Sequence, residues 1–274
     1  MVMSLNMQFS VIMAVYNGDN SEYFDMAIKS LLDQTYLPSE IIVVIDGFIN
    51  DSLKQIVKKY EENKLFVFIK LRENKGLANA LNVGIENTKY DYIARMDADD
   101  ICIANRFEKQ LIFLQSHQDI DVVGTFVTEI NENNKIIKEI VKVPILHKDI
   151  LNLMKKRNPM IHPSVMFRRK FFEKAGMYQN DLLLAEDYQL WYQGFMENCN
   201  FANLPIVGLM FRRTSDFYKR RGNVEKLIIL LKYKITKMNK DLKFGIDADI
   251  YAILYFLIQI SPVFVRKNVY KWLR

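Results

Sequence analysis

The chain has 274 residues, of which 50% are hydrophobic and 26% are charged. This is the composition of a globular protein with enough chain to bury a large core. The net charge is +6, but eleven basic and three acidic residues between Arg212 and Lys243 contribute +8, so the remainder sums to −2. A nucleic-acid-binding protein with a uniformly basic surface is therefore excluded, and one basic segment is expected to face anionic groups such as a membrane leaflet.

Targeting and disulfide signals are not found in the sequence. Cys102 and Cys199 lie far apart and match no metal-ligand spacing, so we expect free thiols in a reducing cytosol. Residues 1–8 contain no basic region followed by an apolar one, so no signal peptide is expected. No stretch reaches the roughly 20 apolar residues that a membrane-spanning helix needs.

Apolar runs alternate with amphipathic segments over the first hundred residues. Four continuous apolar runs predict buried strands, namely Phe9–Val15, Ile41–Ile45, Leu65–Ile69 and Tyr92–Met96. Helices are predicted between them, at 20–34, 51–62 and about 74–87. Strands that are apolar throughout and alternate with helices predict an α/β fold with a mostly parallel sheet, covered on both faces.

Asn17, Asp46 and Asp97 each follow one of the predicted strands. In parallel sheets, ligands bind at the edge where the strands end. We therefore expect the three side chains to converge, although they are roughly 30 to 50 residues apart in sequence. Neither glycine-rich phosphate motif, G-x-G-x-x-G or G-x-x-x-x-G-K-[ST], follows the first strand, so dinucleotide-binding and P-loop proteins are disfavoured.

Three carboxylates, those of Asp97, Asp99 and Asp100, occupy four positions at the end of the fourth strand. Gathered carboxylates are unfavourable unless they are neutralised. The usual neutraliser is Mg²⁺ or Mn²⁺, bound together with phosphate oxygens of a substrate. The alternative is an acidic strand exit that binds no metal.

The second half of the chain is less regular. A helix is predicted at 105–117, and strands at 122–128, 136–143 and 164–167. A helix over Phe171–Ala175 ends at Gly176. His162 lies in a proline-bounded loop, and Glu186 and Asp187 begin an apolar-aromatic helix whose positive end favours anions. That charge complementarity is by itself an alternative explanation of the carboxylate pair.

Six segments in this order resemble family 2 glycosyltransferases of the nucleotide-sugar-dependent GT-A fold. They are Ser10–Asn17, Val44–Gly47, Asn74–Leu77, Asn82–Ile85, Asp97–Asp100 and Glu186–Asp187. The resemblance extends over residues 8–213. Within the family, His162-Pro163-Ser164 and Glu186–Trp191 are most similar to bacterial enzymes that build capsule, O-antigen or exopolysaccharide.

The resemblance implies a role for each matching residue. The nucleotide-sugar site would comprise Ala14, Val15, Tyr16, Asn17, Asp46, Lys75, Asn79, Asp97 and Ala98, with Asp46 reading the uracil edge. Asp99 and Asp97 would hold Mn²⁺ or Mg²⁺ at the diphosphate. His162 is a further candidate ligand of metal, diphosphate or acceptor, and its alternative is a structural hydrogen-bonding histidine. Asp187 matches the catalytic base, and Glu186 would orient the acceptor.

Two departures from the family pattern fall on nucleotide contacts. The aspartate pair usual after the second strand is Ile45-Asp46, followed by Phe48-Ile49-Asn50 in place of a common Ser-Thr-Asp. An arginine often found before Asn82 is Leu81.

The reaction implied is inverting, metal-dependent transfer of a hexose from a nucleotide sugar, with UDP-sugars favoured, to a hydroxyl of a lipid-linked or oligosaccharide acceptor. One alternative is a sugar-nucleotide pyrophosphorylase, which would need a glycine-rich basic loop where this chain has Tyr16–Asp19. Another is a non-catalytic, membrane-peripheral nucleotide-sugar-binding module. The carboxylates Asp97, Asp99 and Asp187 argue against this module.

Residues 1–213 are expected to form the catalytic domain, with a nucleotide-binding half (1–100) and an acceptor half (101–213), and 214–274 a helical extension. Basic residues in 215–243, including Tyr218–Arg221, precede the sixteen uncharged residues Ile250–Val265 and a basic end. Basic flanks around an apolar segment predict an interfacial anchor on an anionic leaflet, at the cytoplasmic face of the plasma membrane. The alternative is a buried helix with its lysines in solvent.

Overall fold

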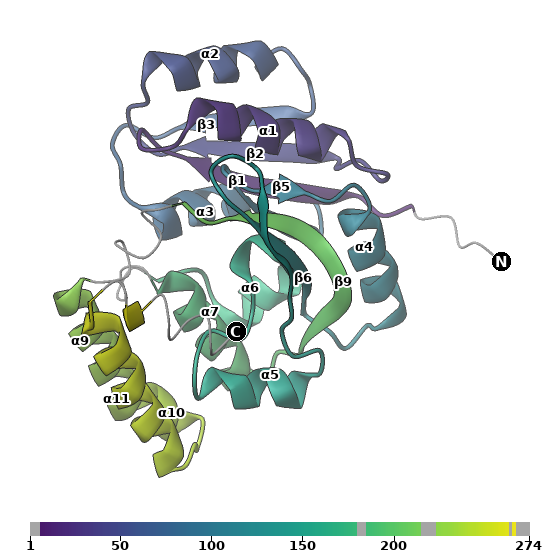
Figure 1. Cartoon of the computed structure of the whole chain (residues 1–274). Helices are drawn as coiled ribbons and strands as arrows, with labels where there is room; N and C mark the ends of the chain where they lie inside the picture. The colour runs from purple at the N-terminus through teal and green to yellow at the C-terminus, as the bar shows by residue number, and fades with distance from the viewer. Residues whose placement is uncertain (1–5, 180–184, 215–222, 263–264, 267–274) are drawn as a thin grey trace.

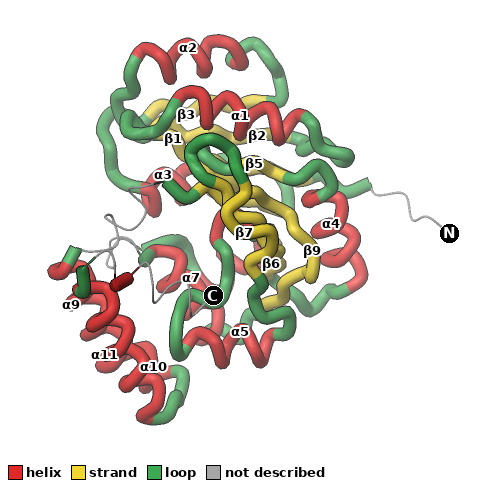
Figure 2. The backbone as a smooth tube through the Cα atoms, in the orientation of Figure 1, coloured by secondary structure: helices red, strands yellow, loops and turns green. Residues whose placement is uncertain are grey.

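The computed structural model describes residues 6–179, 185–214, 223–262 and 265–266. A single nine-stranded sheet runs through the molecule in the order β3-β2-β1-β4-β8-β6-β9-β5, with β7 paired to β6 (Figure 1). Helices pack on both faces, and a helical extension lies at one end (Figure 2). This arrangement confirms the predicted α/β class.

The first half of the chain forms four parallel strands joined by helices. The strands are β1 (Phe9–Val15), β2 (Glu40–Ile45), β3 (Phe66–Lys70) and β4 (Tyr92–Asp97), and the helices are α1 (Ser21–Leu32), α2 (Asp51–Tyr60) and α3 (Leu77–Glu86). All three strand pairs are parallel, as predicted. The helix starts are set by side-chain caps, because Asn20 and Asn50 each accept a hydrogen bond from the first turn of the helix that follows.

Alternating side chains of these strands pack into different layers. Val11 and Met13 of β1 belong to the core under α1, α2 and α4, whereas Ile12 packs with α3 on the opposite face. Both faces of β1 and β2 are buried, so their apolar residues mostly follow one another instead of alternating with polar ones. The polar residues that follow the strands are consequently the first groups that solvent or a ligand can reach.

The second half of the chain completes the sheet with mixed pairing. Its elements are β5 (Ile101–Cys102), α4 (Arg106–Ser116), β6 (Val122–Ile130), β7 (Ile136–Val141), α5 (His147–Met154), the 3₁₀ turn η1 (His162–Ser164), β8 (Met166–Arg168), α6 (Arg169–Ala175), α7 (Glu186–Met196) and β9 (Phe201–Arg212). Strand β8 is antiparallel to β4 and β6, while β6 and β9 are parallel.

One local prediction for this half was wrong, and two strands were missed. Ser164 belongs to the 3₁₀ turn, because its hydroxyl folds back to the Ile161 carbonyl, and the strand begins only at Met166. Strands β5 and β9 were not predicted. The twelve residues of β9 contain Pro205 and alternate irregularly between buried and exposed positions, and the register with β6 shifts near Phe126.

Aromatic side chains fill the core beneath α7. Trp191 is fully buried, stacks on Phe167 with ring centroids 5.9 Å apart, and meets Phe201 edge-on at 6.0 Å. Such contacts add to the stabilisation that burial of the rings provides. Helix α7 is thereby fixed against the sheet along most of its length, including the turn that carries Glu186 and Asp187.

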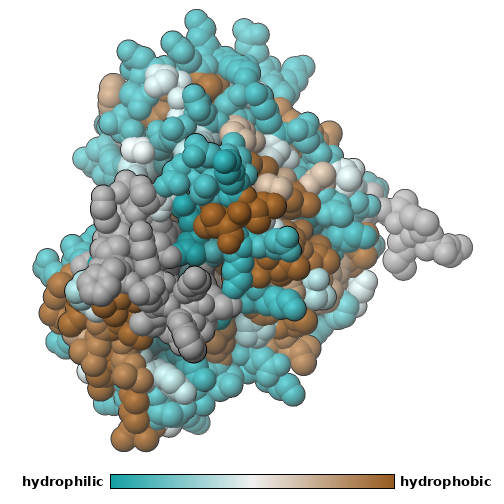
Figure 3. Space-filling view, viewed as in Figure 1, coloured by the Kyte–Doolittle hydropathy of each residue, from teal (hydrophilic) through white to brown (hydrophobic). Residues whose placement is uncertain are grey.

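The extension contains α9 (Val224–Tyr233), a π-helical turn η2 (Lys234–Met238), α10 (Asn239–Asp241) and α11 (Ile246–Ile260). One side is docked: Met238 is buried in the core of the acceptor half, and Tyr233 meets Tyr192 of α7 edge-on. The other side is exposed, and apolar surface gathers there over α9 and α11, at the lower left of Figure 3. The predicted basic segments Tyr218–Arg221 and 267–274 lie outside the described residues.

Within the described ranges, no helix combines the length and the apolar character needed to cross a bilayer.

Two glycines inside helices test how tightly the faces are packed. A Cβ at Gly84 of α3 would lie 3.5 Å from Ile12, whereas one at Gly194 of α7 would lie 2.7 Å from ring carbons of Phe171 and Phe201. We expect Gly84→Ala to raise the free energy of unfolding by up to about 1 kcal/mol through helix propensity. Gly194→Ala should lower it by about 1–3 kcal/mol, because the rings must move.

Urea denaturation of the two variants measures both changes. Equal shifts of the same sign in the two variants would contradict the packing described for α7.

Candidate functional site

The ends of β1, β2 and β4 lie side by side. Ala14 is the register partner of both Val44 on β2 and Asp97 on β4, and the Asp46 N–H donates to the Val15 carbonyl at 2.8 Å. The strand ends that carry Asn17, Asp46 and Asp97 therefore lie at one edge of the sheet, and convergence of the three side chains stays a prediction.

The turn after β1 presents Tyr16 and Asn17 at this edge. The Tyr16 ring is 41% exposed, and its backbone N–H donates to a carboxylate oxygen of Asp19 at 2.9 Å, which fixes the turn. The side chain of Val15 is buried in the core. Val15 can therefore contact a ligand only through its backbone.

Asp46 holds the loop that begins α3. Its carboxylate oxygens accept hydrogen bonds from the backbone N–H groups of Lys75 and Gly76, at 2.8 and 2.9 Å. Gly47 makes this close approach possible, because it has a φ of +82° and a Cβ there would lie 2.5 Å from the Asn74 nitrogen. The contact brings exposed Lys75 to the same edge, with Asn79 in the first turn of α3.

Asp97, Asp99 and Asp100 form a compact acidic cluster. One carboxylate oxygen from each lies within 4.8 Å of the others. Asp100 is fully buried, and one of its oxygens accepts the Arg212 N–H at 2.7 Å. Among the described residues its second oxygen has no hydrogen-bond partner. Burial, together with the charges of Asp99 and Asp97, raises the pKa of Asp100 well above its usual range.

These three residues fit a hard divalent cation such as Mg²⁺ or Mn²⁺. Oxygen ligands and a buried, unsatisfied carboxylate oxygen are what such an ion stabilises. The sequence predicted Asp97 and Asp99 as ligands within a cluster of three aspartates, and the structure places Asp100 close enough to join them. Ala98, between them, is buried, so its side chain packs inward rather than toward a ligand.

Arg95 is a functional residue that sequence reasoning missed. It lies fully buried in the middle of β4, and its guanidinium makes a two-pronged ion pair with the carboxylate of Asp97, with Nη1 to Oδ2 at 2.9 Å. Burial opposes the charge of Arg95, but the carboxylates around it, Asp97 first and Asp187 among them, raise its pKa. A charged residue within an otherwise apolar strand was the available signal.

Arg212, at the end of β9, ties the cluster to distant parts of the chain. Its backbone N–H donates to Asp100, its Nε donates to the Asp99 carbonyl at 2.7 Å, and its Nη1 donates to Asn134 Oδ1 at 2.7 Å. The guanidinium also lies 4.0 Å from the ring centroid of Tyr23. Arg212 thus connects the acidic loop to the loop between β6 and β7 and to α1.

Glu186 and Asp187 occupy the first turn of α7. One oxygen of Asp187 accepts the Tyr188 N–H at 2.7 Å, and the other accepts a hydrogen bond from the side chain of Asn158. Burial, followed by the charge of Asp187, raises the pKa of Glu186 to about 7. The charge of Asp187 contributes to the raised pKa of Arg95. Helix α7 is joined to the loop before β8 by His162, whose ring meets that of Trp191 edge-on at 5.7 Å.

His162 is buried beneath this site. Its Nε2 lies 2.6 Å from the hydroxyl of Tyr178, and burial lowers its pKa well below the usual range. Tyr178 is in turn anchored through its backbone to the side chain of Asn82. In the described chain, the acidic group suited to a metal comprises the three aspartates without His162. The structure therefore gives His162 a hydrogen-bonding role, and ligand binding by it stays a prediction.

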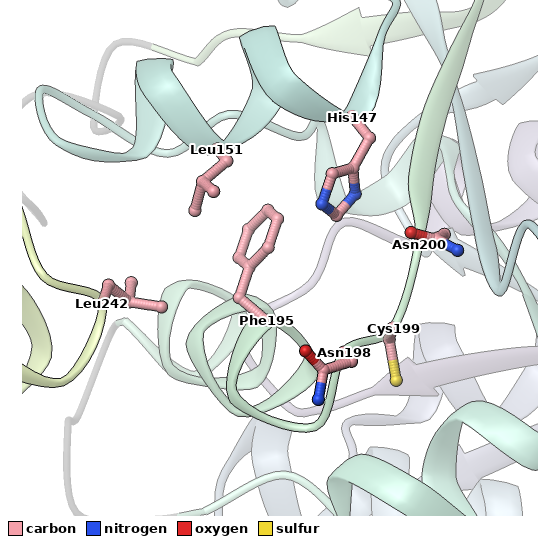
Figure 4. Close-up of a pocket in the computed structure, with 7 residues that line it drawn as sticks. All are labelled: His147, Leu151, Phe195, Asn198, Cys199, Asn200 and Leu242. Atoms are coloured by element: carbon pink, nitrogen blue, oxygen red, sulfur yellow. The ribbon is translucent and has the colours of Figure 1, made fainter.

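A cavity of about 200 Å³ lies away from these residues. It opens between α5, α7 and the extension, lined by residues such as His147, Phe195 and Leu242 (Figure 4). His147 is engaged there, because its Nδ1 accepts the Phe201 N–H at 3.2 Å. None of the site residues predicted from the sequence lines this cavity, so the cavity is separate from the candidate site.

A family model and several curated relatives all indicate the same protein family. The model of "Glycosyl transferase family 2" matches residues 10–176. The amylovoran biosynthesis glycosyltransferase AmsE of Erwinia amylovora is 34% identical, over 96% of this chain and 98% of its own. An Escherichia coli UDP-Gal:alpha-D-GlcNAc-diphosphoundecaprenol beta-1,3-galactosyltransferase is 30% identical, over 96% and 95% of the two chains.

A solved structure supports the fold. The mannosyltransferase PcManGT of Pyrobaculum calidifontis, in complex with GDP-Man and Mn²⁺, superposes with a TM-score of 0.62 at 16% identity. The match covers 92% of this chain and 70% of that one. The predicted GT-A fold is confirmed.

The raised pKa of Glu186 predicts a dependence of stability on pH. Its pKa is 4.5 in an unfolded chain and about 7 in the folded one, so the folded state binds the proton more tightly. The contribution of Glu186 to the free energy of unfolding should therefore fall as pH rises from about 4.5 through 7. Glu186→Gln removes this dependence and should stabilise the protein at pH 8 more than at pH 5, by at most about 3 kcal/mol.

Urea denaturation of both proteins at the two pH values checks the difference. An equal increase in the free energy of unfolding of Glu186→Gln at pH 5 and pH 8 would contradict this prediction.

Proposed function

The chain belongs to glycosyl transferase family 2, and we propose that it transfers a hexose from a UDP-sugar to a hydroxyl of a lipid-linked saccharide, with inversion and with a divalent metal ion. The observation that carries this proposal is the acidic cluster at the strand edge, in which Asp97 is paired with buried Arg95 and buried Asp100 keeps one unsatisfied oxygen. The family membership decides against the sugar-nucleotide pyrophosphorylase considered from the sequence.

The choice of donor and acceptor rests on the relatives. The Escherichia coli relative is named for a UDP-sugar donor and an acceptor carried on diphosphoundecaprenol. The Erwinia relative is named for amylovoran biosynthesis. Both align over nearly the whole chain, so we assign this chain to bacterial surface-polysaccharide synthesis, with the acceptor linked to a lipid diphosphate.

The strand edge would bind the donor. Tyr16 and Asn17 offer a ring and polar groups for the nucleoside, and the loop held by Asp46 brings the Lys75 ammonium nearby. Asp97, Asp99 and Asp100 would hold Mg²⁺ or Mn²⁺, which neutralises the charge that builds on the leaving diphosphate. Arg95 keeps the carboxylate of Asp97 in one orientation, so this ligand is ordered before the donor arrives.

The carboxylates of α7 would act on the acceptor. The acceptor hydroxyl oxygen forms a bond to the anomeric carbon, while the bond from that carbon to the diphosphate breaks and its electron pair leaves with the diphosphate. Asp187 takes the hydroxyl proton as attack proceeds. Attack opposite the leaving group inverts the anomeric centre, as in inverting glycosidases. Glu186, whose pKa is about 7, can donate or accept a hydrogen bond to the acceptor sugar.

The extension would hold the enzyme against an anionic membrane surface. Large apolar side chains, each 43–78% exposed, line the outer side of its helices: Ile246, Ile250, Ile253, Leu254, Leu257 and Ile260 on α11, and Val224, Ile228 and Ile229 on α9. A helix that faces water normally carries polar residues there. The same extension carries exposed lysines, at 232, 237, 240 and 243, alongside exposed Asp241 and Asp247. This combination suits peripheral binding to anionic lipid.

Two carboxylate variants test the reaction. Asp187→Asn should lower transfer by about 10²- to 10⁴-fold, the contribution of a general base. Asp99→Asn should lower it by about 10²-fold or more and weaken the dependence on metal. The measurement is nucleotide release from a panel of sugar nucleotides with Mn²⁺, Mg²⁺ or a chelator, in the presence of a lipid-diphosphate saccharide.

Asp119→Asn, an exposed aspartate at the end of α4, is the matched control and should keep wild-type activity. The proposed function would be overturned if the wild type released no nucleotide from any donor and no nucleotide shifted its melting temperature.

A double substitution tests the membrane surface. Ile253→Glu with Leu257→Glu places two charges in the exposed patch on α11, and we expect binding to vesicles containing phosphatidylglycerol to fall more than about 10-fold. Cosedimentation measures this. Ile112→Glu, an equally exposed apolar residue on α4, is the control. Unchanged vesicle binding by the double variant would exclude this patch as the membrane contact.

A further inference from the structure

Asn158 lies in the loop between α5 and the 3₁₀ turn, directly beside the first turn of α7. Its Nδ2 donates a hydrogen bond to Oδ2 of Asp187. Its Oδ1 accepts one hydrogen bond from the indole Nε1 of Trp191 at 3.1 Å and another from the backbone N–H of Met160 at 3.2 Å. The amide therefore connects the carboxylate of Asp187 to two fixed groups.

The chemistry of these partners determines which way the amide faces. An indole N–H and a backbone N–H can only donate, so both require the carbonyl oxygen of Asn158. The NH₂ group is then forced toward Asp187, whose carboxylate can accept. Turning the amide over would break two hydrogen bonds and bring its oxygen against a carboxylate oxygen, which is unfavourable for a partly buried group.

The groups that hold the amide are themselves rigid. Trp191 lies one helical turn after Asp187 on α7, is fully buried, and packs between Phe167 and Phe201. Pro159 follows Asn158 and restricts its backbone to extended conformations. The indole, the amide and the carboxylate thus form a clamp across one turn of the helix, anchored in the aromatic core.

We propose that Asn158 is a positioning residue for the reaction, which holds Oδ2 of Asp187 in place so that the carboxylate faces the acceptor hydroxyl. The inference rests on the proposed function, in which Asp187 takes that proton. Oδ1 of Asp187 accepts a hydrogen bond from the Tyr188 N–H, so both carboxylate oxygens have a fixed contact. Asn158 itself exchanges no proton.

The proposal predicts a separation between binding and turnover. Asn158→Asp keeps the shape and the oxygen facing Trp191, but replaces the donor to Asp187 with a second acceptor. We expect kcat to fall about 10²-fold, because a base displaced by about 1 Å loses this much. The KM for the sugar nucleotide should stay within twofold, since the donor is bound at the strand edge. Trp191→Phe, which removes the indole N–H together with part of the buried ring system, should lower kcat about 10-fold.

A matched control exists in the extension. Asn239 also donates from its amide to an aspartate, Asp249, at 2.7 Å, and it is buried. Asn239→Asp therefore creates the same pair of like charges away from the site, and it should leave kcat unchanged. Steady-state rates are measured with the full chain, a UDP-sugar that the wild type accepts and a synthetic lipid-diphosphate saccharide. Nucleotide-binding stoichiometry gives the folded fraction of each variant.

The outcomes separate this inference from the proposed function. A large loss of kcat at an unchanged KM in Asn158→Asp, with a smaller loss in Trp191→Phe and none in Asn239→Asp, supports it. Full kcat in Asn158→Asp or Trp191→Phe, in a background where Asp187→Asn is inactive, overturns the positioning role and leaves the proposed function standing. Full activity of Asp187→Asn overturns both.

Discussion

The candidate site is arranged around Arg95, whose buried guanidinium charge must be neutralised by nearby carboxylates. Arg95 lies in the middle of β4 with no access to solvent, and a charge there is tolerated only when it is paired. Asp97 supplies the direct partner two residues later, where β4 ends. Asp100 and Asp187 add their charges from the acidic loop and from α7. The same positive charge reduces the repulsion among the carboxylates, so the acidic cluster and the helix turn can approach one another.

Contacts distant in sequence hold this arrangement together. Arg212 connects Asp99 and Asp100 with the hairpin of β6 and β7 and with Tyr23 of α1. Asn158, from another loop, joins the carboxylate of Asp187 to the indole of Trp191 on the same helix. The residues that touch the reacting groups are therefore few, whereas those that orient them come from almost every part of the chain. Positioning of this kind is what converts several carboxylates into a defined site.

The sequence predicted what depends on local pattern. Buried parallel strands are apolar at each position, so Phe9–Val15 and Ile41–Ile45 were recognisable, and the acidic residues after Met96 marked the strand edge. Strand β9 was missed because it is defined by pairing with β6, and Pro205 and a register shift obscure its alternation. Arg212 and Asn158 escaped notice because their roles come from partners far away in sequence, which no local pattern records. Arg95 did have a local signal, its charge within an apolar strand, and its partner Asp97 lies two residues later. His162 stood out as a rare residue, yet its described hydrogen bond is to Tyr178.

The helical extension packs against α7. Tyr192, on the same helix as Asp187, bonds to Asp241 and meets Tyr233 edge-on, and Lys234 lies 5.0 Å from the ring of Tyr188. The buried-helix interpretation of this segment is therefore right for the side that faces α7, while the outward side keeps its apolar residues exposed. The interfacial anchor predicted for the outward side stays a prediction. Because the extension is packed directly on the helix that carries the carboxylate pair, a surface that contacts α9 and α11 is held in a fixed relation to Asp187. An acceptor anchored in that surface would reach the site with part of its translational freedom already lost, which favours transfer.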